Sequence, residues 1–126
     1  MNFTFGADKR LKSRKSIEQL FLEGKKLHRF PVTAVYSVEE SEKPSFQIAV
    51  SAPKKHMKKA SDRNTIKRRL REAVRLNQDK LSFPAKLSMM LIYTTNEKLE
   101  YKQIEQSVIA LFALLNLTVN DQIVKK

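Results

Sequence analysis

The sequence feature that most constrains this chain is a strongly basic stretch with a helical apolar repeat, residues 54–75. It holds ten of the chain's 25 Lys and Arg residues but only two acidic residues, Asp62 and Glu72. Charge concentrated in this way repels itself and is tolerated best where a polyanion neutralises it. Because the net charge of the whole chain is +12, we expect the partner to be a nucleic acid or an anionic membrane surface.

The second half of the stretch is predicted to be a helix from about Ser61 to Asn77, with Ser61 and Asp62 as suitable N-cap residues. Its apolar residues share one side at a helical spacing and would pack on a core: Ile66, Leu70, Ala73 and Val74. The helix also carries polar and basic residues away from this apolar side, beginning with Arg63 in the first turn. We expect these residues to face a polyanion: Arg63, Asn64, Lys67, Arg68, Arg71 and Arg75.

A basic loop directly precedes this helix, from Pro53 to Ala60. It adds four lysines to the candidate binding surface: Lys54, Lys55, Lys58 and Lys59. The alternative for the helix alone is a solvated cationic face without a partner, since surface charge is common. The adjoining loop and the scarcity of acids favour polyanion binding.

The length of 126 residues predicts a single domain, 1–126, with a basic N-terminal arm at 1–12 and an unassigned tail at 117–126. Cys is absent, which excludes disulfides, thiolate catalysis and Cys-ligated zinc. No apolar run is long enough for a membrane span, and the N-terminus lacks the apolar segment of a signal peptide. We therefore expect a cytoplasmic protein without a membrane partner.

The periodicity predicts a mixed sheet with helices packed on it. The two middle strands are expected to form a hairpin through a polar loop at 39–45, and Gly24 to end the first helix. The strand KLSMMLIYT has a continuous apolar centre, which predicts a central position. The expected elements are a helix at 13–23, strands at 30–38 and 46–52, the basic helix at 61–77, a strand at 86–94 and a helix at 99–116.

The segment RNTIKRRLR, from Arg63 to Arg71, resembles the signature helix of the bacterial ribonuclease P protein component. Thr65 departs from the pattern, which usually has Arg at this place. The upstream AVS at 49–51 and Lys54-Lys55 resemble the family's strand end and basic loop. The N-terminal half is similar too, so the resemblance runs from about residue 5 to residue 116.

This resemblance implies an α+β fold, an α/β sandwich of the ribosomal protein S5 domain 2-like type. Its order would be helix, three strands, helix, strand, helix, with a mixed four-stranded sheet and a left-handed β-α-β crossover. The periodicity alone would favour the usual right-handed crossover. The fourth strand is expected within residues 30–52 or in the short pieces beside them.

The resemblance also implies a function: the accessory protein subunit of ribonuclease P, the tRNA-processing endonuclease that hydrolyses the 5′ leader from precursor tRNA. Catalysis would lie in the RNA subunit with Mg²⁺, so no catalytic residue is expected on this chain. The partners would be the ribonuclease P RNA and precursor tRNA, with no protein partner evident. A non-enzymatic ribosomal or structural RNA-binding protein is the alternative.

A cleft between the first helix and the sheet is implied as the site of the single-stranded leader. The candidate cleft residues are Ile17, Phe21 and Tyr36. Aromatic rings stack bases with little sequence choice, which suits varied leaders. For Phe21, core packing is an equal alternative, whereas the Tyr36 hydroxyl favours a wet edge. His28 and His56 are not expected to bind metal, and Asp62 is more simply a helix cap than a ligand for hydrated Mg²⁺.

Overall fold

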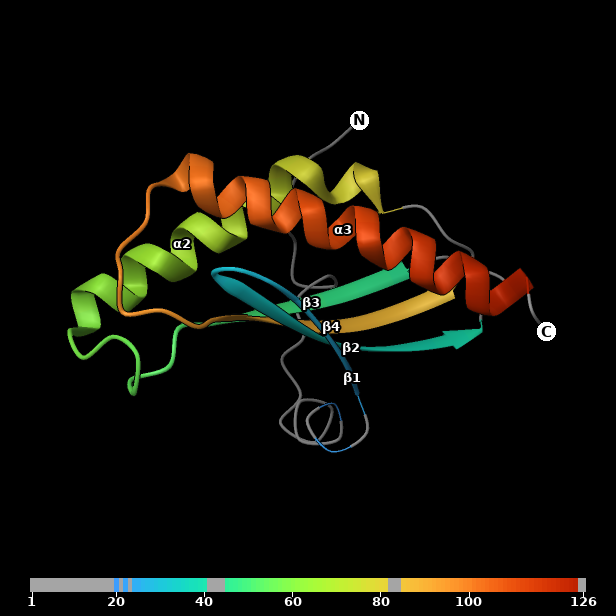
Figure 1. Ribbon diagram of the computed structural model, residues 1–126, viewed down its shortest axis with the longest axis horizontal. Helices are drawn as coiled ribbons and strands as arrows, with labels where there is room; N and C mark the ends of the chain where they lie inside the picture. The colour runs from blue at the N-terminus through green and yellow to red at the C-terminus, as the bar shows by residue number, and fades with distance from the viewer. Residues whose placement is uncertain (1–19, 21, 23, 41–44, 82–84, 125–126) are drawn as a thin grey trace.

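A computed structural model describes residues 20, 22, 24–40, 45–81 and 85–124 of the chain (Figure 1). Leu20 and Leu22 are helical, and the rest of the helix expected at 13–23 lies outside the described residues. The elements that follow are β1 (Lys25–Arg29), β2 (Val32–Glu40), β3 (Ser45–Ser51), α2 (Ala60–Asn77), a short 3-10 helix (Gln78–Lys80), β4 (Ala85–Tyr93) and α3 (Tyr101–Val124).

The four strands form one mixed sheet in the order β1-β2-β4-β3, as the α+β prediction requires. β2 runs antiparallel to both of its neighbours, β1 and β4, and β3 runs parallel to β4. The fourth strand is β1, immediately before residue 30, which confirms the alternative that placed it in a short piece beside residues 30–52. Phe30 and Pro31, joined by a cis peptide bond, connect it to β2.

The expected hairpin between the two middle strands is wrong, because β4 lies between β2 and β3. In the observed register Met89 of β4 pairs with Tyr36 of β2 on one side and with Ile48 of β3 on the other. The physical reason is the apolar character of β4 on both faces, which stabilises it at the centre and confirms that part of the prediction. The β3-α2-β4 unit is therefore a parallel crossover, and its left hand stays a prediction.

Both long helices cover the same face of the sheet, with α3 lying across α2 (Figure 1). The main core fills this layer and includes the apolar side of α2, so the predicted packing of that side is confirmed. From the strands it takes alternate side chains, as expected for a two-layer arrangement. Its largest fully buried members include Tyr93, Phe112, Ile48, Ile66, Leu70 and Leu87.

The opposite face of the sheet carries a smaller cluster in which Leu20 packs against Val35 and Met90. Gly24 lies at the edge of this cluster and donates its N–H to the Leu20 carbonyl at 2.8 Å. A Cβ atom on Gly24 would lie 2.9 Å from Val35 Cγ1 and 3.1 Å from the Tyr36 carbonyl oxygen. The described glycine has no positive φ, so close approach to the sheet, and not a left-handed turn, favours glycine here.

Two helix boundaries differ from the predictions. α2 begins at Ala60, one residue earlier than expected. α3 continues to Val124, so most of the tail left unassigned at 117–126 is helical. Among the described residues, no helix is long and apolar enough to cross a membrane.

Candidate nucleic-acid interface

The polar side of α2 is displayed to solvent because its apolar side is anchored in the core. Ile66 and Leu70 are fully buried beneath the helix. Asn64, Arg68 and Arg71 are exposed, as the periodicity predicted. Arg is well suited to phosphate because its planar guanidinium can donate two parallel hydrogen bonds to one anion.

Two of the predicted cations on α2 are engaged within the protein. Arg63 Nη1 donates to the carbonyl oxygens of Met57 at 3.0 Å and Lys58 at 2.7 Å, so it holds the preceding loop against the helix. Arg75 forms an ion pair and hydrogen bonds with Glu72. The hydrogen bond and charge of Arg75 lower the pKa of Glu72, while Glu72 raises that of Arg75.

The side chains of Thr65 and Arg69 also donate hydrogen bonds within the protein. Thr65 Oγ1 donates to the Ser61 carbonyl at 3.0 Å, one turn earlier in α2. Arg69 Nη1 donates to the Leu99 carbonyl and so ties α2 to the segment before α3. On this helix Arg68 and Arg71 are therefore the exposed arginines best placed to meet an external anion.

The basic loop is fixed at both ends, which gives its lysines defined positions. The N–H groups of His56 and Met57 donate to the Pro53 carbonyl at 3.1 and 3.2 Å. Met57 is only 5% exposed and belongs to the main core, so it anchors the loop beneath α2. The four predicted lysines are all exposed on this anchored loop: Lys54, Lys55, Lys58 and Lys59.

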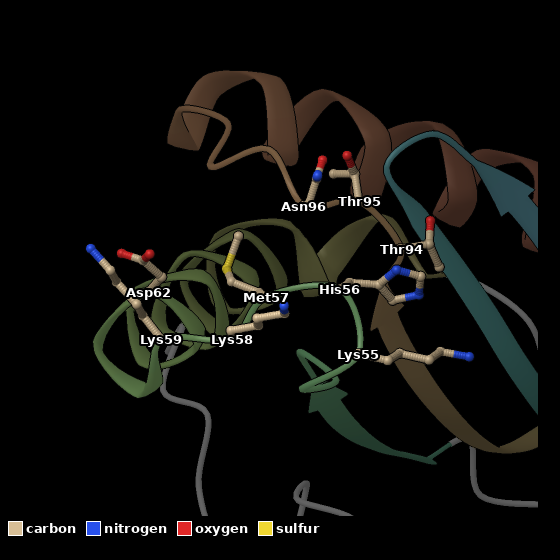
Figure 2. Close-up of a pocket in the computed structure, with 9 residues that line it drawn as sticks. All are labelled: Lys55, His56, Met57, Lys58, Lys59, Asp62, Thr94, Thr95 and Asn96. Atoms are coloured by element: carbon tan, nitrogen blue, oxygen red, sulfur yellow. The ribbon is translucent and has the colours of Figure 1, made fainter.

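The loop, the start of α2 and the connection that follows β4 line an open basic hollow of about 570 Å³ (Figure 2). Three of the predicted lysines line it, but Lys54 does not. Its opposite wall was missed by sequence reasoning, because polar residues more than 30 positions away carry no local signal of this proximity. The lining residues are Lys55, His56, Met57, Lys58, Lys59, Asp62, Thr94, Thr95 and Asn96.

Asp62 is the only carboxylate in the lining, and its role differs from the predicted helix cap. The N-cap residue is Lys59, and no side chain caps the helix start. Asp62 lies in the first turn, and its Oδ1 is 3.4 Å from Lys98 Nζ. Lys98 therefore offsets the one negative charge in the hollow, which stays net positive and open to anions at a helix N-terminus.

Tyr36 does not line an open cleft, so that part of the site prediction is wrong. Its side chain is 2% exposed and belongs to the main core under α2 and α3. Burial raises the pKa of its phenol. The strand period of two explains the error: Val35, and not Tyr36, points to the face where Leu20 packs. The other two predicted cleft residues, Ile17 and Phe21, lie outside the described residues.

The described part of the chain contains no group of three or more His, Asp or Glu residues that could hold a metal ion. His28 instead pairs its Nδ1 with Thr33 Oγ1 at 2.7 Å across the β1–β2 hairpin. His56 stands among the lysines of the hollow. The site is thus cationic and hydrogen-bonding in character, which suits polyanion binding.

Sequence comparison matches residues 5–116 to the family model described as Ribonuclease P. The ribonuclease P protein component of Porphyromonas gingivalis, represented by two strains, is 38% identical over 82 residues. That match covers 63% of this chain and 60% of the relative, so the chain spans less than two thirds of the relative's length in the alignment.

Solved structures agree on the fold. The ribonuclease P protein of Staphylococcus aureus has a TM-score of 0.69 at 18% identity and covers 85% of this chain and 94% of that one. The protein from Thermotoga maritima has a TM-score of 0.67 at 19% identity, with coverage of 82% and 94%. At these identities the likeness establishes the shared architecture.

Proposed function

Because the chain belongs to the ribonuclease P protein family, we propose that it is the accessory protein subunit of a ribonuclease P that removes the 5′ leader of precursor tRNA. The observation that carries the proposal is the anchored basic surface of α2 and its preceding loop, within a family match over residues 5–116. The surface has the charge and donors to bind RNA, whereas no catalytic constellation was found in the sequence.

The catalytic RNA would bind along the exposed side of α2. Arg68 and Arg71 would contact phosphates, and Asn64 could donate to or accept from a sugar or base edge. The basic hollow, which Lys55, Lys58 and Lys59 line beside the uncapped start of α2, would take a further phosphate. Arg63 would act indirectly, by holding the loop that carries these lysines.

The leader would bind on the other face of the sheet, the one that carries Val35 and Met90. This placement keeps the implied cleft between the first helix and the sheet but removes Tyr36 from it. Ile17 and Phe21 remain predictions for its other wall. Separate faces for the catalytic RNA and the leader would let one small domain hold both at once.

Magnesium would be held mainly by the RNA subunit, where the chemistry of phosphodiester hydrolysis would occur. The described side chains do not supply a cluster that fits a divalent ion. This chain would contribute indirectly, since its cations lower the repulsion between two RNA molecules and so reduce the Mg²⁺ needed for their association.

Reconstitution tests the proposal. The full chain is mixed with a bacterial ribonuclease P RNA and a precursor tRNA, and leader removal is followed at low Mg²⁺. Faster cleavage, or a lower Mg²⁺ requirement, supports the assignment. Unchanged cleavage combined with co-sedimentation on ribosomes would instead favour a structural RNA-binding protein, and duplex DNA competing as well as structured RNA would favour a DNA-binding one.

A further inference from the structure

A second hollow lies between the β1–β2 turn and α3 and has a different chemistry. Its volume is about 490 Å³, within the roughly 300–1,000 Å³ of small-molecule sites. One wall is formed by Arg29, Phe30 and Pro31, and α3 contributes the facing wall with Gln103 and Gln106. It shares no lining residue with the basic hollow.

Phe30 stands out because it is 60% exposed at the rim of this hollow. An isolated exposed apolar side chain is ordinary and needs no explanation. Here, however, Arg29 and two glutamines of α3 line the same hollow as Phe30, and the Arg29 guanidinium donates to the His28 carbonyl at 2.8 Å. An open aromatic face, a cation and amides together are the groups with which proteins bind unpaired bases.

The walls of the hollow are held in place by the fold. Ser107 Oγ donates to the Phe30 carbonyl at 2.7 Å. The N–H and Oγ1 of Thr94 donate to the Pro31 carbonyl at 2.8 and 3.0 Å. Because these bonds fix the backbone at Phe30 and at the residue that follows it, little ordering entropy would be lost when a base stacks there.

A row of cations leads to the hollow along the edge strand β1. Three of its five residues are exposed cations, Lys25, Lys26 and Arg29, whereas His28 is exposed and Leu27 is half-buried. Lys25 and Arg29 share the side of the strand on which Leu27 packs toward the core under α3. They are separated by about 13 Å along the strand, so both can attract the backbone of one extended nucleic acid segment.

Glu97 in the wall decides which part of a nucleotide would enter the hollow. Its carboxylate would repel a phosphate, whereas it can accept hydrogen bonds from the amino group of a base. Gln106 supplies both a donor and an acceptor. The base would therefore lie inside and the phosphates outside, along β1.

We propose that β1 and this hollow form a binding site for single-stranded RNA, in which one base stacks on Phe30 while the backbone follows the cations of β1. The site is distinct from the α2 surface and rests on the proposed function only for its choice of RNA as the nucleic acid. It gives the protein a contact for an unpaired segment at the edge of the sheet.

A tryptophan reporter tests this site directly, because the chain contains no Trp. The indole introduced by Phe30→Trp should be quenched when a single-stranded RNA oligonucleotide is added at low salt. Quenching should persist in Arg68→Ala/Arg71→Ala, which weakens the α2 surface. Quenching that persists when reconstituted cleavage fails would separate this site from the proposed function. No quenching in either background would overturn the proposal.

Affinity measurements supply the second arm. Phe30→Ala should weaken binding of a labelled single-stranded oligonucleotide by roughly tenfold, the typical loss for one stacked base. It should leave binding of heparin, a polyanion without bases, unchanged. Leu117→Ala is the matched control, because it also removes an exposed apolar side chain, in this case one on α3. This variant should bind as the wild type does. Equal affinity of Phe30→Ala and wild type for RNA would overturn the proposal, as would an equal loss for heparin.

Discussion

Arg63 donates from Nη1 to the carbonyl oxygen of Lys58 at 2.7 Å, so the first arginine of the basic helix binds the loop that presents the lysines. A second bond from the same nitrogen reaches the Met57 carbonyl. The basic surface is thus one preorganised unit and not two independent segments. The sequence predicted that Arg63 would face a polyanion, but in the structure it donates hydrogen bonds to the protein backbone.

Arg63→Ala should therefore act mainly through the protein. We expect a loss of about 1–2 kcal/mol in the free energy of unfolding, because two carbonyl oxygens lose a charged donor. Denaturant unfolding measures this loss, and amide hydrogen exchange should quicken in residues 54–59. Arg68→Ala is the control, since its exposed side chain should cost less than about 0.5 kcal/mol. Equal stability of the two variants would contradict a loop-holding role for Arg63.

Arg68→Ala and Arg71→Ala should instead weaken RNA binding directly. If each arginine neutralises one phosphate, each substitution should reduce the slope of log affinity against log salt by about one. Filter binding or anisotropy over a salt series measures this slope. Lys102→Ala removes an exposed charge from α3 and should leave the slope nearly unchanged. Identical slopes for all variants and the wild type would rule out phosphate contacts on α2.

Gly24→Ala should destabilise the fold, since the new methyl group would lie too close to Val35 Cγ1 and the Tyr36 carbonyl. Overpacking of this kind costs about 1–3 kcal/mol. Thermal or denaturant unfolding measures the loss. Leu22→Ala is the contrasting variant, because that side chain is 86% exposed and should change stability by less than about 0.5 kcal/mol. A Gly24→Ala protein as stable as the wild type would contradict this prediction, because it would show that residue 24 can move away from the sheet at little cost.

Burial of Tyr36 predicts a specific alkaline response. Because burial raises the pKa of this phenol, the folded state holds its proton at pH values where the unfolded chain has lost it. The contribution of the protonated Tyr36 phenol to the free energy of unfolding is complete below about pH 10, the usual pKa of Tyr. It is lost as the pH rises through the pKa of Tyr36 in the folded state. Tyr36→Phe should therefore show a shallower decline in unfolding free energy above about pH 10.

Tyr93→Phe serves as the contrast for Tyr36. The Tyr93 hydroxyl donates to the Glu97 carbonyl and accepts from the Leu99 N–H at 3.1 Å, so its removal should already lower stability at neutral pH. Burial raises the pKa of the Tyr93 phenol as well, so the contrast in urea unfolding is the loss at neutral pH, which Tyr93→Phe should show more strongly than Tyr36→Phe. If Tyr36→Phe declines as steeply as the wild type, the phenol is solvated and the burial argument fails.

Local periodicity was enough to predict the two faces of α2 and the central place of β4, because both depend on which side chains leave water. Strand neighbours were harder to predict. A polar loop between two alternating segments usually marks a hairpin, but β4 competed successfully for both partners from more than 30 residues away.

The site was predicted in outline and wrong in particular side chains. Charge placed the surface on α2 and its loop, yet the sequence could not show that Arg63 and Arg75 bind partners within the protein. Tyr36 illustrates another limit: strand alternation separates its side from that of Val35 but does not say which side the helices cover. The sequence around Phe30 did not indicate a binding residue, because the exposure of this side chain depends on how α3 crosses the sheet edge.

The most direct test of the central claim is the single-turnover rate of leader removal by a bacterial ribonuclease P RNA at limiting Mg²⁺, measured against protein concentration. The wild-type chain should accelerate cleavage, and Arg68→Ala/Arg71→Ala should need a higher concentration for the same rate while circular dichroism shows it folded. No acceleration by the folded wild-type chain at any concentration would contradict the account.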